Sequence, residues 1–158
     1  MNSTLYEKLL IRRWNESEAV PYDLLLLADD TIIAIDKYLE NGELFVTDIE
    51  GKIIAAFILK VENKETIEIK NIAVSKEFQG KGIGSILLKY IAENVKNRGF
   101  KNLLVGTCDQ CFNEIEFYKK SGFEDFKIRK DFFINNYNEP IYEKDKQIFD
   151  MIVLKKTF

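Results

Sequence analysis

Alternating glycines make residues 79–85 the part of this sequence best suited to binding an anion. The run Gln79-Gly80-Lys81-Gly82-Ile83-Gly84-Ser85 follows an apolar stretch and leads into an amphipathic segment. Glycine has no Cβ to block a close approach, and the first N–H groups of a helix lack intrahelical partners and carry the positive end of the helix dipole. The run therefore predicts a cradle for a phosphate or pyrophosphate at the start of a helix.

Two other phosphate-binding motifs do not fit these residues. A P-loop requires Gly-x-x-x-x-Gly-Lys-Ser/Thr, which the chain does not contain. A dinucleotide fingerprint requires Gly-x-Gly-x-x-Gly, but Ser85 stands where the third glycine would follow Gly80 and Gly82. A glycine-rich connection without chemical meaning stays an alternative, although each glycine in a helix costs about 1 kcal/mol relative to alanine. That cost favours a functional reason for the glycines.

The wider pattern resembles the GNAT superfamily of N-acetyltransferases. The family signature is a strand ending in hydrophobic-Ala-Val, then Gln/Arg-x-x-Gly-x-Gly/Ala and a long amphipathic helix, and here Ile72-Ala73-Val74 precede the glycine run. Downstream, Phe117-Tyr118-Lys119-Lys120-Ser121-Gly122-Phe123 is similar to the family's aromatic-Tyr-x-x-x-Gly-Phe segment. Two motifs in this order, within about residues 43–125, are more specific than either alone.

The resemblance implies acetyl-coenzyme A as co-substrate, without a metal. The strand would bind the pantetheine arm through its main chain, and the N–H groups of the glycine turn would hold the pyrophosphate. Many family members have an asparagine where Cys111 stands, and Asn113 is the nearby substitute. The side chain of Lys81 either contacts a phosphate or is solvated. The implied cofactor-binding set is Ile72, Ala73, Val74, Gln79, Gly80, Lys81, Gly82, Ile83, Gly84, Ser85 and Asn113.

Direct aminolysis of a thioester requires a base for the amine, a donor for the carbonyl oxygen and an acid for the departing thiolate. By resemblance, Glu68 is the candidate base, acting through a water, although an exposed strand glutamate is the alternative. Tyr118 is the candidate acid, with aromatic packing as its alternative, because a phenol can protonate a thiolate. The Val74 N–H is the natural oxyanion donor if a bulge splays the strand.

Two rival functions stay open on the sequence. A non-catalytic coenzyme A binding or sensing module would keep the glycine turn and lack turnover. A thiol–disulfide protein is the remote alternative, because Cys108-Asp109-Gln110-Cys111 follows an apolar strand and precedes a helix. That alternative leaves the glycine run unexplained, so the two cysteines are predicted to be reduced, small loop residues.

Composition narrows the classes of protein. The 158 residues are 46% hydrophobic and carry a formal net charge of −3, which fits one compact domain over residues 1–158 and disfavours a nucleic-acid partner. The chain contains no histidine, so a zinc site or a Ser-His or Cys-His nucleophile is excluded or nearly so. No stretch approaches the length of a membrane span and no leader is recognisable, which predicts a cytoplasmic protein.

The elements that must position these residues follow from hydrophobic periodicity and turn signals. The resulting order is β-α-α-β-β-β-α-β-α-β-β, an α/β domain with a GNAT-like mixed, mostly antiparallel central sheet flanked by helices. Six of the seven predicted strands have definite bounds, 6–13, 44–46, 53–59, 66–74, 103–105 and 149–154, and the seventh follows the turn at residues 122–123. The first predicted helix starts at residues 24–27, and the others span 31–39, 84–98 and 113–120. Residues 131–137 and 139–142 either wall an acceptor cleft or pack as a surface loop. The acceptor, a small-molecule or peptide amine, is not identified, and a homodimer stays open.

Overall fold

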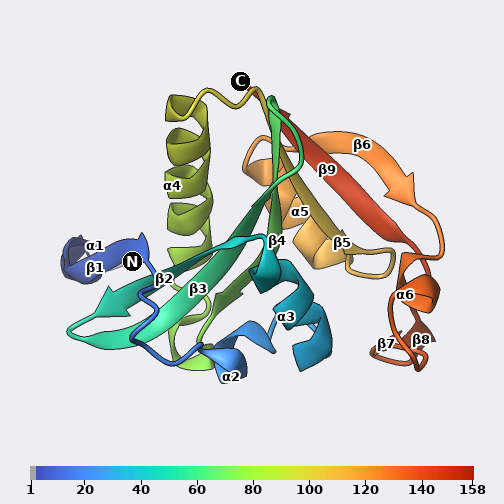
Figure 1. Ribbon diagram of the computed structural model, residues 1–158, viewed down its shortest axis with the longest axis horizontal. Helices are drawn as coiled ribbons and strands as arrows, with labels where there is room; N and C mark the ends of the chain where they lie inside the picture. Colours follow the sequence, from blue (N-terminus) through green and yellow to red (C-terminus); the bar gives the residue numbers. More distant parts are fainter. Residues whose placement is uncertain (1–2) are drawn as a thin grey trace. The chain divides into compact units, whose positions relative to one another are not determined.

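The computed structural model describes residues 3–158 as an α/β protein with a seven-stranded, mostly antiparallel sheet (Figure 1). The chain divides into two compact units, Met1–Val61 with Ile69–Ile91 and Glu62–Glu68 with Ala92–Phe158. In the first unit the strand order is β1-β2-β3-β4, and in the second it is β4-β5-β9-β6. Strand β4 contributes residues to both units.

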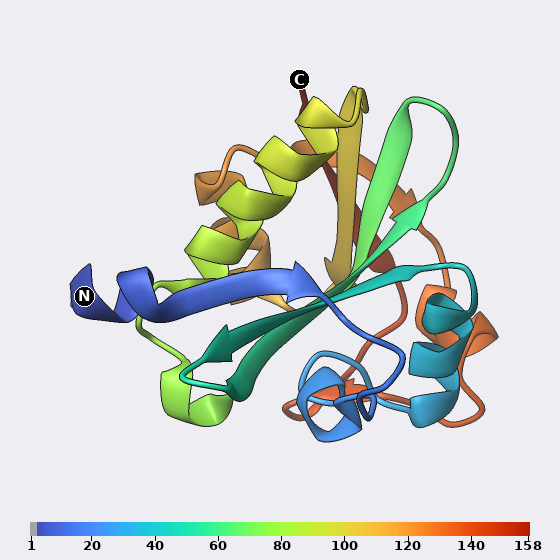
Figure 2. The same cartoon turned by 60° about the vertical axis from the view of Figure 1, so that its left-hand side comes forward.

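The first unit contains the following elements: α1 (Ser3–Lys8), β1 (Leu9–Arg13), α2 (Tyr22–Leu25), α3 (Ile32–Glu40), β2 (Glu43–Ile49), β3 (Lys52–Val61), most of β4 (Thr66–Val74), the 3-10 turn η1 (Lys76–Phe78) and the first part of α4 (Ile83–Asn97). Strand β1 pairs antiparallel with β2 from Leu9↔Ile49 to Arg13↔Phe45, and Figure 2 shows it beside the β2–β3 hairpin. The hairpin turns at Glu50 and Gly51, whose φ angles of 49° and 83° are both positive.

Period-two alternation gives the β2–β3 hairpin two apolar faces. On one face Val46 and Ile58 pack with Leu25 of α2 and Ile35 of α3. On the other face the rings of Phe45 and Phe57 stack 4.8 Å apart between centroids, and both contact Tyr90 of α4. Helices α2 and α3 therefore cover one face of the hairpin and α4 the other, which makes this hairpin the centre of the first unit's core.

The second unit contains β5 (Asn102–Cys108), α5 (Phe112–Lys120), β6 (Glu124–Arg129), α6 (Phe132–Asn135), β7 (Tyr142–Glu143), β8 (Lys146–Gln147) and β9 (Met151–Thr157), together with the start of β4 and the end of α4. The last strand pairs antiparallel with β5 on one side, Gly106↔Val153, and with β6 on the other, Ile128↔Ile152. Gly106 packs closely on this strand, because a Cβ there would lie 2.4 Å from Sδ of Met151.

The predicted helix after the glycine run, the hairpin and the strand 66–74 are all present in the structure. Two predicted elements are wrong in detail. Residues 6–8 belong to helix α1 because pairing with β2 begins only at Leu9. The last third, predicted as strands alone, also contains α6 and the short β7–β8 hairpin, whose few residues are too short for a periodic pattern. None of the helices within residues 3–158 has the length and apolar character that a bilayer crossing requires.

Candidate active site

The glycine run forms a tight turn that delivers the chain into α4. Its two αL positions are Gly80 and Gly82, with φ of 75° and 81°. A Cβ at Gly80 would meet nothing within 4 Å, so the backbone angle and not a lack of space requires glycine there. The first intrahelical hydrogen bond runs from the Ile86 N–H to the Gly82 carbonyl at 3.2 Å. The N–H groups that precede Ile86 in this turn are those that a helix start leaves for an anion.

The side chains of the turn have separate structural roles. Gln79 Nε2 donates to the Val74 carbonyl at 2.9 Å, so the glutamine ties the end of β4 to the glycine turn. The Lys81 ammonium lies 5.5 Å from the centroid of the Phe78 ring. Ile83 is buried in the core, and it offers a ligand only its main chain. The structure thus brings the Gln79 side chain to the Val74 carbonyl.

At the end of β4 the burial of successive residues alternates. Ala73 is buried, whereas Ile72 and Val74 are partly exposed. The Ser75 N–H donates to the Ile54 carbonyl at 2.8 Å and continues the pairing with β3 beyond Val74. The main chain of Ile72 and Val74 therefore belongs to strand β4, which leads directly into the glycine turn.

Glu68, also on β4, is a buried ionic residue. It is 1% exposed, and the Arg129 guanidinium donates to both of its carboxylate oxygens, with 2.9 Å between Nη1 and Oε2. The same Nη1 lies 3.3 Å from Sδ of Met151. The alternative of an exposed strand glutamate is therefore wrong. Arg129 is a site residue that the sequence analysis missed, because it lies 61 positions from Glu68 on strand β6 and no local pattern marks it.

Tyr118 is buried on α5 between aromatic rings. Its ring centroid lies 5.4 Å from that of Phe117 and 5.8 Å from that of Phe123. Burial, and secondarily the charge of Glu114, raises the pKa of the Tyr118 phenol well above its usual value, so the phenol stays protonated at neutral pH. Glu114 is itself held by Thr107 of β5, whose hydroxyl donates to Oε2 at 2.6 Å.

The segment between β5 and α5 corrects the prediction of reduced cysteines. Cys108 and Cys111 form a disulfide, with their Cα atoms 5.1 Å apart. The turn that brings them together is closed by a hydrogen bond from the Cys111 N–H to the Cys108 carbonyl at 3.1 Å. A carboxylate oxygen of Glu143 lies near both sulfurs, but the sulfurs are bonded to each other. Asn113 lies in the first turn of α5, and its side chain is exposed and does not pack in the core.

The predicted site residues fall into two groups. Residues 72–74 and the glycine turn belong to the first unit. Glu68, Tyr118 and Asn113 belong to the second unit, as do Arg129 and Glu114, which were not predicted. Each group is ordered by contacts within its own unit: Gln79 with Val74 in the first, and Arg129 with Glu68 and Thr107 with Glu114 in the second.

These elements define a class of enzymes that bind an acyl-coenzyme A. They are a strand ending in Val74, a glycine turn with two αL residues and a following amphipathic helix. The family model of the acetyltransferase (GNAT) family matches residues 7–123, and the chain belongs to this family. It is therefore an acyltransferase, and the predicted family and α/β fold are confirmed.

Three similar proteins span nearly the whole chain. The uncharacterized N-acetyltransferase YvbK of Bacillus subtilis (strain 168) is 35% identical over 148 residues, 94% of this chain and 96% of that protein. A GNAT family acetyltransferase from Elizabethkingia anophelis, crystallised with acetyl-CoA bound, is 41% identical with a TM-score of 0.93, covering 96% of this chain and 99% of that one. The IAA acetyltransferase from Bacillus cereus ATCC 14579 is 37% identical with a TM-score of 0.87, covering 95% and 99%.

Proposed function

We propose that this acyltransferase transfers the acetyl group of acetyl-CoA to a primary amine by direct attack of the amine on the thioester. The observation that carries the proposal is the turn of Gly80 and Gly82, both at positive φ, at the start of α4, where the first N–H groups of a helix lack intrahelical partners. The Elizabethkingia anophelis relative, 41% identical, binds acetyl-CoA, which supports the same co-substrate here.

The cofactor-binding residues are proposed on the same basis. A diphosphate carries negative charge that first-turn N–H groups and the helix dipole stabilise, and the main chain at Ile72 and Val74 offers amide partners to a pantetheine arm. Ala73, Lys81, Ile83 and Asn113 complete the proposed set, together with Gln79 and the glycines and serine that follow it. Gln79 contributes by holding the Val74 carbonyl at 2.9 Å, which orders the junction between strand and turn.

Tyr118 is the proposed general acid. Its phenol is protonated at neutral pH, as the acid that quenches a departing thiolate must be. When the amine attacks the acetyl carbon, the carbon–sulfur bond breaks and the coenzyme A thiolate accepts the phenolic proton. The rings of Phe117 and Phe123 pack against the Tyr118 ring and hold it in place.

Glu68 is the proposed general base, acting through a water. The amine loses a proton as it attacks, and a carboxylate held by the two prongs of Arg129 keeps its negative charge and a fixed position. Because Glu68 is buried, a water is the natural carrier of the proton between the amine and the carboxylate. The Val74 N–H is the proposed donor to the carbonyl oxygen.

The acceptor is proposed to be a small-molecule amine or a peptide amine, and the whole chain, residues 1–158, is proposed to act as one domain. The test is a release assay for free coenzyme A thiol with acetyl-CoA and an amine library, alongside calorimetry with acetyl-CoA. We expect saturable binding of acetyl-CoA and turnover with at least one amine. Binding without turnover of any amine would favour a coenzyme A sensing module, and no binding would overturn the proposal.

A further inference from the structure

A cavity of about 790 Å³ lies in the first unit, and none of the residues assigned to acetyl transfer above is among those that line it. It is lined by Trp14 from the segment that joins β1 to α2 (residues 14–21), by Tyr22 of α2, and by Asp36, Lys37 and Glu40 of α3. This volume is within the range of sites that hold small molecules, and such sites combine aromatic walls with a few polar groups.

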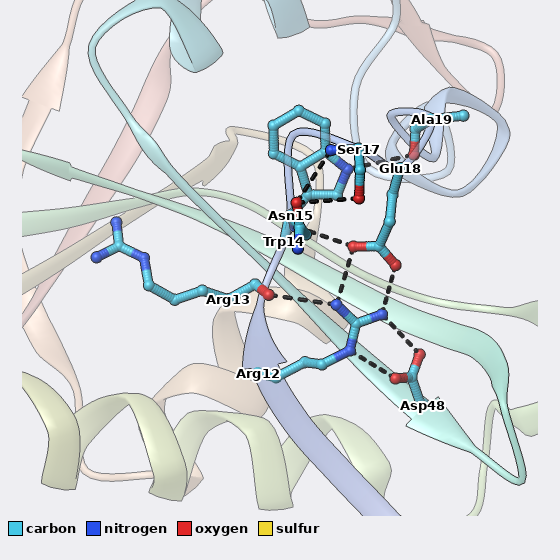
Figure 3. Close-up of polar contacts among 8 residues, drawn as sticks. All are labelled: Arg12, Arg13, Trp14, Asn15, Ser17, Glu18, Ala19 and Asp48. Atoms are coloured by element: carbon cyan, nitrogen blue, oxygen red, sulfur yellow. Dashed lines mark hydrogen bonds and ion pairs between the residues drawn. The ribbon is translucent and has the colours of Figure 1, made fainter.

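The segment that forms one wall is held in place by an ion-pair network (Figure 3). Arg12 donates from Nε to Asp48 Oδ2 at 2.6 Å, and from Nη1 and Nη2 to the two carboxylate oxygens of Glu18 at 2.9 and 2.6 Å. Its Nη1 also donates to the Arg13 carbonyl at 3.3 Å. The guanidinium thus ties residue 18 of the segment to strands β1 and β2.

The same segment is braced internally. The Asn15 N–H donates to Glu18 at 2.9 Å, and the Asn15 side chain accepts from both the N–H and the hydroxyl of Ser17 at 3.0 Å. The Trp14 indole donates to the Ala19 carbonyl at 3.3 Å. Because the wall is ordered by its own contacts, a ligand would not have to supply that ordering.

The residues that line the cavity favour the binding of a cation. Asp36 and Glu40 stand one turn apart on α3, so their carboxylates lie on one face of the helix, and Lys37 is the single opposing charge among the lining residues of the described chain. Asp36 is oriented by the Tyr22 hydroxyl, which donates to Oδ1 at 2.6 Å. Aromatic rings attract cations through their faces, and carboxylates pair with ammonium groups.

We propose that this cavity binds an organic cation, a primary ammonium on an apolar stem of a few carbons. The carboxylates of Asp36 and Glu40 take the ammonium group, and Trp14 and Tyr22 contact the stem. Two sources share this chemistry: the amine that becomes acetylated, in which case the inference rests on the proposed function, or an amine that binds without reacting.

Trp14 is the only tryptophan of the sequence, so intrinsic fluorescence reports on this cavity directly. The probes are butane-1,4-diamine and n-butylamine at neutral pH. The control compounds of the same chain length are n-butanol, which is neutral, and butanoate, which is an anion. We expect a saturable change in Trp14 fluorescence with the two amines and no change with the two control compounds. Asp36→Asn and Glu40→Gln should each weaken amine binding about two- to fivefold, as for an exposed ion pair. Glu16→Gln, an exposed glutamate of the same segment outside the network, is the control.

Equal responses to butylamine and butanol, or unchanged amine binding in both carboxylate variants with an intact circular dichroism spectrum, would overturn the inference. Steady-state kinetics distinguish the amine that becomes acetylated from an amine that binds without reacting. A raised KM for the amine with unchanged kcat in Asp36→Asn identifies the acceptor, and an unchanged KM with weakened binding identifies an amine that does not react. Fluorescence requires no acetyl transfer, so failure of turnover with intact amine binding counts against the proposed function alone.

Discussion

Arg129 on β6 holds Glu68 on β4 in a two-pronged ion pair that joins residues 61 positions apart, and the Glu68 side chain is 2% exposed against 24% for Arg129. A carboxylate this deeply buried depends on its partner, because an uncompensated charge in the interior costs several kcal/mol. The candidate base is therefore also a structural residue of the second unit.

Arg129→Met should destabilise the protein by about 3–5 kcal/mol, since it leaves the Glu68 charge buried without its guanidinium. Urea denaturation measures the free energy of unfolding. Lys119→Met is the control, because the exposed Lys119–Asp125 pair of the same unit, at 3.0 Å, should contribute at most about 1 kcal/mol. A loss for Arg129→Met no larger than that of the control would contradict the role of the pair.

Glu68→Gln should lower kcat by about 10²-fold or more if the carboxylate accepts the proton of the amine. Glutamine keeps the shape and can still accept one hydrogen bond from Arg129, so circular dichroism should show a folded protein. A kcat within twofold of the native enzyme would remove Glu68 from the mechanism and leave it as the partner of Arg129.

Tyr118→Phe should lower kcat by about 10²-fold while leaving the KM for acetyl-CoA nearly unchanged, because phenylalanine fills the same space without the acidic hydroxyl. Tyr90→Phe, another tyrosine among aromatic rings, is the control. Burial, followed by Glu114, raises the pKa of Tyr118, so its proton is retained as pH rises and kcat should show no loss from Tyr118 ionisation up to about pH 10. An alkaline loss below that pH, absent in Tyr118→Phe, would contradict the raised pKa of Tyr118, whereas a kcat of Tyr118→Phe within twofold of the native enzyme would count against its role as the acid.

Gly80→Ala should both destabilise the protein, by about 1–2 kcal/mol, and weaken acetyl-CoA binding, because alanine disfavours a φ of 75°. Gly51→Ala is a matched control: its φ is 83°, a Cβ there also meets nothing within 4 Å, and it lies in the β2–β3 turn. Calorimetry should show weaker acetyl-CoA binding for the first variant alone. Equal affinities in the two variants would contradict the cradle.

The pH dependence of stability should report the Arg12–Glu18 pair. The hydrogen bonds from Arg12, and then from the Asn15 N–H, lower the pKa of Glu18 from 4.5 to about 2. A carboxylate with a depressed folded-state pKa stabilises the protein above its unfolded pKa, and the contribution is lost as pH falls through the folded value. The stability advantage of the native chain over Glu18→Gln should therefore shrink between about pH 4.5 and pH 2 in urea titrations. A constant difference over that range would show that the pair does not contribute.

The elements that could be predicted from the sequence are those that depend on preferences of neighbouring residues. The φ preference of glycine and the repeat of apolar residues predicted the turn at Gly80 and Gly82 and the helix α4 that follows. Thr31 was predicted to start a helix, and it caps α3 by accepting from the Ala34 N–H at 3.1 Å. The family resemblance rested on these same short patterns.

The sequence by itself determined the glycine turn, the β2–β3 hairpin, the long helix and the family, because φ preferences, turn residues and hydrophobic periodicity act between neighbours in the chain. Only the tertiary structure decided that Glu68 is buried against Arg129, that Arg12 joins Glu18 to Asp48, and that Cys108 and Cys111 are bonded. Burial and charge pairing depend on which strands become neighbours in the sheet, and that depends on packing between residues far apart in the chain.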